Sequence, residues 1–237
     1  MLRLTQKLLY LSLFFSASCL AGILETGYRA EFNLYASGFY VATTTRQLLK
    51  TQDGMEYRTD TQPEGIAKWY TSDTLVEISK FKIKNNTITA QSYRYQQTGD
   101  EEEKIINIIF DHDNENVRLS NETRVHTLHA ESYDALSFQI ALMQKLALGE
   151  KTLIADVADQ NGLYTYDANL AGNETIQTKI GTLDTLKILM KNRQNGNLFT
   201  FWCASKFDFL PVRIELERKD SGISSILEIQ TTPKPVQ

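Results

Sequence analysis

Three histidines are the side chains best suited to metal chemistry: His112, His126 and His129. Carboxylates stand near the first of them: Asp111, Asp113 and Glu115. Two imidazoles and a carboxylate can bind zinc or another divalent cation. Residues 126 and 129 differ in parity, however, so on one strand their side chains would point to opposite faces. The stretch 111–116 also has the composition of a surface turn. We favour the turn interpretation and expect no cofactor. If a metal ion is bound, the three histidines are the candidate ligands.

The sequence contains no motif of a nucleophilic enzyme. Gly-x-Ser-x-Gly, His-Glu-x-x-His and a glycine-rich phosphate loop are all absent. Ser137 has no histidine beside it in the sequence, and paired carboxylates such as Asp156 and Asp159 are too common to identify an acid–base site. We therefore expect no catalytic residue. A hydrolase or metal-binding enzyme that uses the histidine region is the alternative.

Cys203 lies in a run of strand-forming residues, Phe199 to Cys203. On a strand, residues 199, 201 and 203 share one face, which favours a buried structural thiol. A reactive cysteine would need positive neighbours, and only Lys206 is close in sequence.

Aromatic residues are the more suggestive feature, with 11 Tyr, 11 Phe and 2 Trp, expected mostly on strands. Some must fill the core, and others could line an apolar concavity on a curved sheet. The expected ligand-binding residues are Trp69, Tyr93, Tyr95, Phe201 and Trp202. The expected ligand is a lipid, an acyl chain or a lipopeptide.

The N-terminus predicts export. Arg3 and Lys7 precede an apolar run at 8–15 that is too short to span a bilayer, and small residues follow it. Cleavage after Ala21 would give a signal peptide, 1–21, and a periplasmic domain, 22–237. Cys19 offers a second interpretation, a lipid anchor, but Ser16 stands where a lipobox has a large aliphatic residue. No later stretch has the ~20 consecutive apolar residues of a transmembrane helix.

The charge balance argues against nucleic acid as a partner. The net charge of −4 becomes −6 without Arg3 and Lys7, with 23 basic residues against 29 acidic ones. A mildly acidic domain with no basic stripe is poorly suited to a phosphate backbone.

Apolar residues recur mainly with a period of two, as in the segment 28–36, where residues 28, 30, 32 and 34 alternate with polar ones. Turn residues such as Asn161-Gly162 and Asn195-Gly196 separate the segments. The pattern predicts a mostly β, single-domain protein: a strongly curved antiparallel sheet or half-barrel of roughly eleven or twelve strands around one central helix. The last few residues, from Thr232, are expected to be a frayed tail.

The expected helix is 132–149. Ser132 is its predicted N-cap, and Gly149 stands where a glycine would end it. Residues 136, 140, 143 and 147 form an apolar stripe, so we expect this helix to lie against the concave face of the sheet.

Several motifs resemble one family. They are Tyr28-x-Ala-x-Phe32, Gln91-Ser-Tyr-Arg-Tyr95, Asp134-Ala-Leu-Ser137, Gly181-x-Leu-x-Thr-x-Lys187 and, most specifically, Phe201-Trp202 followed by Asp208-Phe-Leu-Pro-Val-Arg-Ile-Glu215. Over residues 26–231 the chain is similar to the DUF3108 family of exported bacterial proteins of unknown function. The chain departs from the family after Gly99, where Asp100 to Glu103 are acidic and members often have a basic, glycine-rich segment. The resemblance implies a half-barrel broadly similar to bacterial lipoprotein carriers, and no activity.

These observations favour a non-enzymatic protein of the cell envelope. We expect it to bind an apolar ligand or an envelope protein partner on a curved sheet. Besides the enzyme alternative, the chain could be an interaction module in envelope assembly that binds no small ligand.

Overall fold

The structure, a computed structural model, describes residues 22–99 and 102–236. The predicted signal peptide and Cys19 lie outside the described residues.

Among the described residues, one sheet contains fifteen strands. Their bounds are β1 Tyr28–Ala36, β2 Phe39–Thr51, β3 Gly54–Pro63, β4 Thr74–Lys84, β5 Thr87–Thr98, β6 Lys104–Asp111, β7 Asn116–Leu119, β8 Val125–Thr127, β9 Ser132–Asp134, β10 Thr152–Asp159, β11 Gly162–Thr178, β12 Gly181–Asn192, β13 Leu198–Ala204, β14 Leu210–Glu217 and β15 Ser224–Ile229. The helices are α1 Ile23–Thr26 and α2 Ser137–Ala147, with short 3-10 turns η1 Gly65–Trp69 and η2 Ser205–Phe207.

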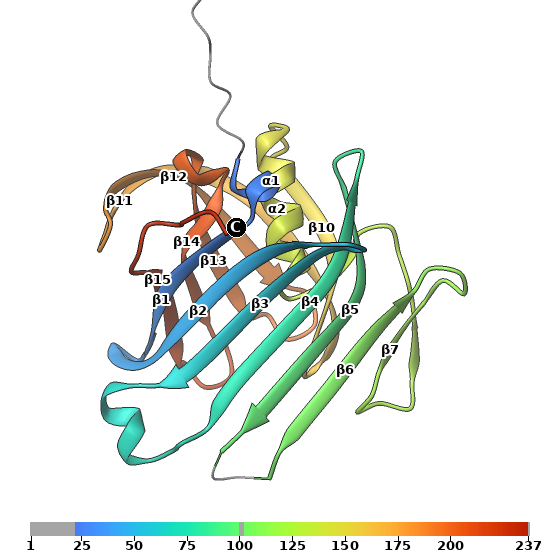
Figure 1. The fold of residues 1–237 in the computed structure, drawn as a ribbon, viewed down its shortest axis with the longest axis horizontal. Coiled ribbons are helices and arrows are strands. Elements are labelled where there is room, and N and C mark those ends of the chain that lie inside the picture. Colours follow the sequence, from blue (N-terminus) through green and yellow to red (C-terminus); the bar gives the residue numbers. More distant parts are fainter. Residues whose placement is uncertain (1–21, 100–101, 237) are drawn as a thin grey trace, which may run out of the picture.

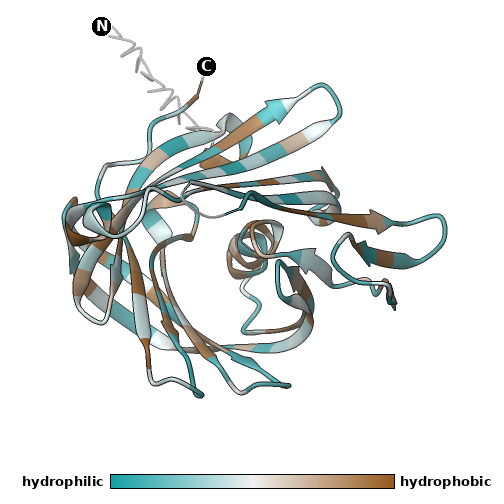
Figure 2. Cartoon of the chain, turned by 90° about the horizontal axis from the view of Figure 1, so that it is seen from below, coloured by the Kyte–Doolittle hydropathy of each residue, from teal (hydrophilic) through white to brown (hydrophobic). Residues whose placement is uncertain are grey.

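The sheet is open and strongly curved. Its order runs from β8 back through β1, then from β15 back to β9, so that the first and last long strands are neighbours. Every pair is antiparallel except β9 with β10. Seen along the opening, the strands curl around α2 (Figure 2), and the ribbon forms an incomplete barrel (Figure 1). The predicted mostly β class is therefore confirmed.

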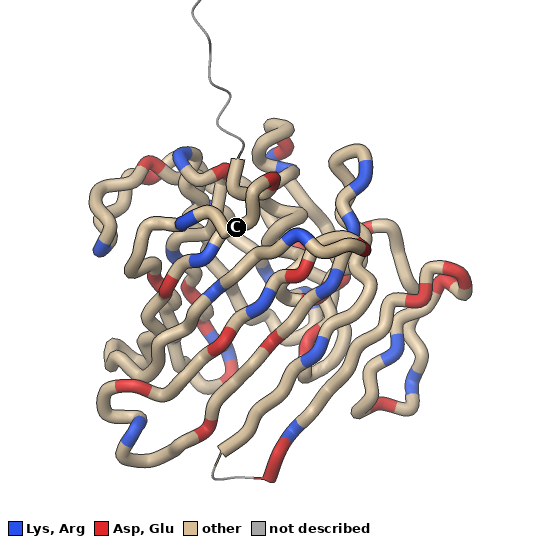
Figure 3. Tube along the Cα trace, in the orientation of Figure 1, with Lys and Arg blue, Asp and Glu red and all other residues tan. Residues whose placement is uncertain are grey.

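Alternating side chains build these strands, as the period of two predicts. In β1 the residues 28, 30 and 32 are buried and those between them are exposed. Inward apolar side chains bury surface worth about 25 cal/mol per Å², while outward polar ones stay hydrated. Charged residues of both signs are interspersed along the chain (Figure 3).

The predicted helix starts too early in the sequence. Residues 132–134 form β9, which pairs with β10, and α2 begins only at Ser137. Asp134, rather than Ser132, accepts the first free backbone N–H groups, those of Leu136 and Ser137. The predicted end is confirmed, because Gly149 follows the C-cap with φ of 79°.

The number of strands exceeds the expected eleven or twelve. Short strands β7, β8 and β9 carry too few residues for a clear period. The run after Asn161 is also longer than expected, because β11 continues past Leu170 through a bulge at Gly172. A second helix, α1, is present, so α2 is not the one helix of the fold.

Two further features concern the predicted C-terminal tail and the predicted absence of a transmembrane helix. Near the C-terminus, where a frayed tail is expected, Lys234 pairs with Arg29 of β1 in an isolated bridge. Within the described residues, no helix combines the length and apolar character needed to cross a bilayer.

Candidate functional site

The inner face of the sheet can be followed as rows of register partners that point toward α2. The first row crosses β1 to β5 as Tyr28, Leu48, Tyr57, Ser79 and Tyr93. All five side chains are essentially inaccessible to solvent. Ser79 of this row bonds Asp134, which lies just before α2.

The second row lies one step along the strands, toward the end of β1, and contains several polar side chains. It consists of Ala30, Arg46, Thr59, Glu77 and Tyr95. Arg46 and Thr59 are buried, whereas Glu77 is only partly buried. A half-buried carboxylate on the inner face of a β-rich fold is unusual, because carboxylates are normally placed in solvent.

In the third row, the side chains become partly exposed to solvent. Phe32 and Thr44 are buried, but Thr61, Leu75 and Gln97 are only partly buried. Strands β1, β3 and β5 end on this side, and β2, β4 and β6 begin there. We call this side the open end. Solvent reaches inward-facing side chains there, because α2 covers only the rows nearer its own end.

An apolar row faces the same open end from the other half of the sheet. Leu34, Leu227, Ile214 and Phe201 are successive register partners. Phe201 is buried, and the other three are partly buried. We call the partly buried inward residues Leu34, Thr61, Leu75, Glu77, Gln97, Phe199, Ile214 and Leu227 the distal inner face.

A chain of aromatic contacts connects α2 with this surface. Phe138 of α2 packs against Phe201, with ring centroids 6.1 Å apart. Phe201 stacks on Phe199 at 6.3 Å, and Phe199 meets Tyr166 edge to face at 6.0 Å. Of these rings, Phe199 is the partly exposed one on the distal inner face, and the buried rings pack behind it.

Asp134 is the centre of a buried hydrogen-bond network at the start of α2. Its carboxylate accepts hydrogen bonds from the hydroxyls of Ser79 (2.7 Å) and Ser137 (2.6 Å). The backbone N–H groups of Leu136 and Ser137 donate to its other oxygen. Burial raises the pKa of this carboxyl, and these hydrogen bonds partly offset the rise. The network is structural, because Asp134 has no solvent exposure.

Arg46 provides a second connection between the sheet and α2. Its Nη1 donates to Oε1 of Gln139 at 2.9 Å, and its guanidinium lies 5.0 Å from the ring centroid of Phe32. The residue is 5% exposed, and among the described residues its Nε has no hydrogen-bond partner and its guanidinium forms no ion pair. Burial of such a cation is costly, so its aromatic and amide partners are required.

Glu77 connects the polar row to the open end. The hydroxyls of Tyr93 (2.5 Å) and Thr59 (3.1 Å) donate to its two carboxylate oxygens. Burial, followed by the charge of Glu77, raises the pKa of Tyr93 well above its usual value. Across the interior, burial raises the pKa of Tyr166 to about 12. Both phenols therefore stay protonated at neutral pH, and Tyr93 donates its hydrogen bond to Glu77.

Three of the five expected ligand-binding residues lie on inner rows, where all three are buried and outside the distal inner face. Tyr93 and Tyr95 belong to the first and second inner rows, and Phe201 belongs to the apolar row opposite. Trp202 lies on the other face of β13, between Lys187 and Arg213, whose charges are 5.1 and 5.7 Å from its ring. Trp69 is 86% exposed in η1, outside the sheet.

Each predicted metal-binding histidine has a different partner. A ring nitrogen of His112 lies 2.6 Å from the carbonyl oxygen of Ala90, His126 pairs with Glu122, and His129 pairs with Asp156. Within the described residues, no group of three or more potential ligands has a spacing suited to a metal ion. The arrangement is that of separate surface contacts.

The other chemistry-bearing residues have structural partners. Cys203 is fully buried, and burial raises the pKa of its thiol. Asp156 accepts from Thr165 and contacts His129, and Asp159 accepts the backbone N–H of Asn161. Burial raises the pKa of Asp159. None of these groups lies beside a nucleophile in a hydrogen-bonded triad.

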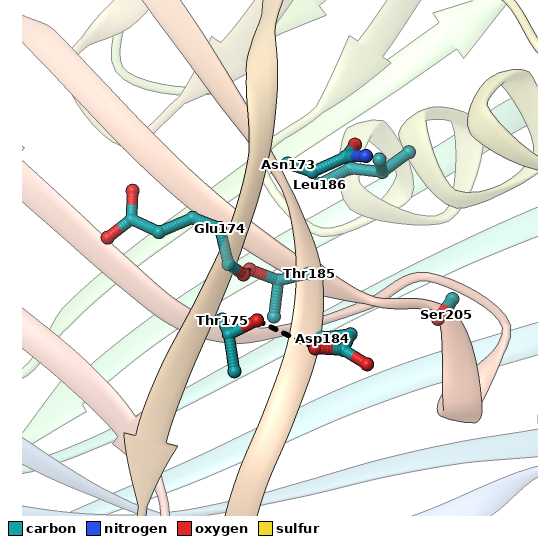
Figure 4. A pocket seen from close by; sticks show the side chains of 7 residues that line it. All are labelled: Asn173, Glu174, Thr175, Asp184, Thr185, Leu186 and Ser205. Atoms are coloured by element: carbon teal, nitrogen blue, oxygen red, sulfur yellow. Dashed lines mark hydrogen bonds between the residues drawn. The ribbon is translucent and has the colours of Figure 1, made fainter.

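A polar cavity of about 370 Å³ lies on the β11–β12 hairpin, away from the inner face. Its lining includes Glu174, Thr175 and Asp184, and the Thr175 hydroxyl donates to Asp184 at 2.7 Å (Figure 4). Glu174 is engaged by Lys187 at 2.9 Å. The polar groups at this cavity thus bond to one another.

Comparison with solved structures supports the class defined by this geometry, a β-barrel-like protein. The crystal structure of a β-barrel-like protein of domain of unknown function DUF1849 from Brucella abortus is similar, with a TM-score of 0.56 and 10% identity, over 90% of this chain and 98% of that one. At this identity the likeness shows the fold alone. The family model for proteins of unknown function DUF3108 matches residues 26–228, and the chain belongs to that family. No curated protein matches the sequence.

Sequence reasoning missed Arg46, Glu77 and Asp134. Arg46 and Asp134 each occupy a position whose neighbours two residues away are buried, and Glu77 has one such buried neighbour, Ser79, which is the available signal. Charged residues at core-facing positions of a period-two pattern are rare and need partners. Those partners come from other strands or from α2, so the local pattern does not identify them.

Proposed function

We propose that this chain is an exported protein of the cell envelope that binds an apolar ligand, a lipid or acyl chain, on its distal inner face. The observation that carries the proposal is the loss of burial along the inner rows. Leu34, Leu227 and Ile214 face inward but keep partial exposure, although apolar side chains at such positions normally complete a core.

The chemistry of the surface supports an amphipathic ligand. One side is apolar and aromatic, through Phe199 and its partners, and the other carries Thr61, Glu77 and Gln97. Apolar sites with a few placed polar groups are typical of small-molecule binding. An acyl chain would lie along this apolar side, and its polar end would meet the hydroxyl of Thr61 and the amide of Gln97.

Binding of a dansyl-labelled fatty acid to purified residues 22–237 tests the proposal. We expect saturable fluorescence enhancement, and at least about a tenfold weaker affinity for Ile214→Glu, because a charge placed in an apolar site must be desolvated. Ile154→Glu is the matched control, since Ile154 is 56% exposed on β10. We expect its affinity to match that of the unaltered protein.

Two further measurements complete the test. Circular dichroism and thermal unfolding establish that each variant is folded, and Leu75→Ser replaces Ile214→Glu if the latter is not. Fusion of residues 1–21 to a reporter that is active only after export tests the localisation. The absence of saturable binding in the folded, unaltered protein would exclude the ligand proposal and leave an envelope-assembly module.

A further inference from the structure

Four apolar side chains protrude from two adjacent connections at the open end. Phe39 is 61% exposed, Ile66 52%, Trp69 86% and Tyr70 87%. We call these four residues the aromatic tip. Single exposed apolar residues are common on soluble proteins, but a group of large ones on adjoining loops marks an interaction site.

The aromatic tip is held firmly on the sheet. The backbone N–H of Glu64 donates to the carbonyl of Val41 at 2.8 Å, which fixes the entry to η1. Gly65 follows with φ of 59°, and a Cβ there would lie 2.7 Å from the carbonyl oxygen of Tyr40. Only glycine permits this approach of η1 to β2. The tip is therefore a preformed feature of the fold.

Strand directions place the tip beside the distal inner face. Phe39 begins β2, and η1 connects the end of β3 with the start of β4, so both connections belong to the open end. In Figure 1 they are adjacent loops at the lower left. Leu75 of the distal inner face follows Tyr70 by only a few residues along the chain. The tip thus forms part of the rim of the open end.

The charges around the tip determine which kind of surface it suits. Lys68 pairs with Glu64 at 2.7 Å. The open end carries charges of both signs, with Glu102, Glu103 and Lys104 at the start of β6 and Arg218 and Lys219 between β14 and β15. These mixed charges form no basic patch that would select anionic head groups, whereas Trp and Tyr favour the boundary between head groups and acyl chains.

We propose that the aromatic tip docks on a bilayer surface of neutral, zwitterionic lipid, with Trp69 and Tyr70 inserted at the head-group level. The open end then faces the membrane. This docking goes beyond the proposed ligand binding and does not require it, because the tip lies outside the distal inner face.

Sedimentation of residues 22–237 with phosphatidylcholine vesicles tests the proposal. We expect the Trp69→Ala/Tyr70→Ala variant to lower the partition coefficient at least about tenfold, since burial of two aromatic side chains is lost. Val125→Ala/Ile154→Ala is the matched control, because these residues are 57% and 56% exposed elsewhere on the sheet. We expect the partition coefficient of this control to equal that of the unaltered protein. We also expect high salt to leave the partition coefficient of the unaltered protein unchanged.

Fluorescence reports the docking at the residue itself. The sequence contains two tryptophans, so Trp202→Phe leaves Trp69 as the one emitter. We expect a blue shift with vesicles and quenching by brominated acyl chains. Absence of partition by the unaltered protein, or partition only on anionic vesicles, would overturn the proposal, as would crosslinking of the tip to a protein without vesicle binding.

The two proposals fail separately. Ile214→Glu is expected to weaken fatty-acid binding at least about tenfold and to retain vesicle docking. Trp69→Ala/Tyr70→Ala is expected to weaken vesicle docking and to retain fatty-acid binding. Loss of docking in Ile214→Glu, with its fold intact, would contradict the assignment of docking to the tip.

Discussion

Ser79 of β4 donates a hydrogen bond to the carboxylate of Asp134, with 2.7 Å between the two oxygens. Asp134 is the last residue of β9 and precedes α2, so this contact ties the start of the helix to the middle of the curved sheet. Without it, the helix would lack its main polar attachment to the first inner row.

Replacing Asp134 with alanine should destabilise the fold strongly. The change leaves two hydroxyls and two backbone N–H groups without their acceptor, which predicts a loss of about 2–4 kcal/mol. Urea unfolding followed by circular dichroism measures it. Asp113→Ala, on an exposed turn, is the control and should change stability by less than about 0.5 kcal/mol. Equal effects of the two substitutions would contradict the structural role.

The stability of the fold should depend on pH through Asp134. Burial raises the pKa of this carboxyl above its usual 3.8, so the folded state binds its proton more tightly than the unfolded state. The resulting stabilisation is complete below about pH 4 and is lost as the pH rises through the folded pKa. The stability advantage of the unaltered protein over Asp134→Asn should therefore decrease upward from pH 4. Urea unfolding across this range checks the sign, and an advantage that grows with pH would refute it.

Arg46 and Gln139 should be energetically coupled. Gln139→Ala removes the acceptor of a buried guanidinium and should cost about 2–4 kcal/mol. Arg46→Met/Gln139→Leu should recover much of this loss, which gives a coupling energy of about 1–3 kcal/mol in a double-mutant cycle. The exposed pair Arg94 and Gln96, whose side chains are 3.2 Å apart, is the matched control. Its coupling should be near zero, and similar values for both pairs would count against the buried contact.

The thiol of Cys203 should be protected by the fold. Burial raises the pKa of the thiol, and it is fully enclosed. In purified residues 22–237 under native conditions, a thiol reagent should label Cys203 only as fast as the protein unfolds locally or globally. In denaturant, labelling should be immediate. Rapid labelling under native conditions, with circular dichroism unchanged, would show that β13 is accessible.

Some elements could be predicted from local pattern alone. The strand 28–36 has the expected bounds, and Gly149 ends α2 as expected. Both depend on neighbouring residues: alternation of side chains in one case, a left-handed conformation in the other. The start of α2 could not be predicted in this way, since Ser132 also satisfies the rules for an N-cap. Pairing of residues 132–134 with β10 decides that segment.

The candidate site shows the same division. Tyr93, Tyr95 and Phe201 were expected to bind a ligand, and all three point to the inner face. Trp69 and Trp202 were expected with them, but they lie in a loop and on the outer face. Aromatic content does not say which face a residue occupies: residues 201 and 202 are adjacent on β13, so alternation places their side chains on opposite faces.

By itself, the sequence determined the class of fold, the family and most strand positions, because side-chain alternation and turn residues act over a few neighbouring positions. The tertiary structure alone decided that β1 pairs with β15, that Asp134 meets Ser79, and that burial fades toward the open end. These contacts join residues far apart in the chain. They depend on the curvature of the whole sheet and on the length of α2, which no local pattern specifies.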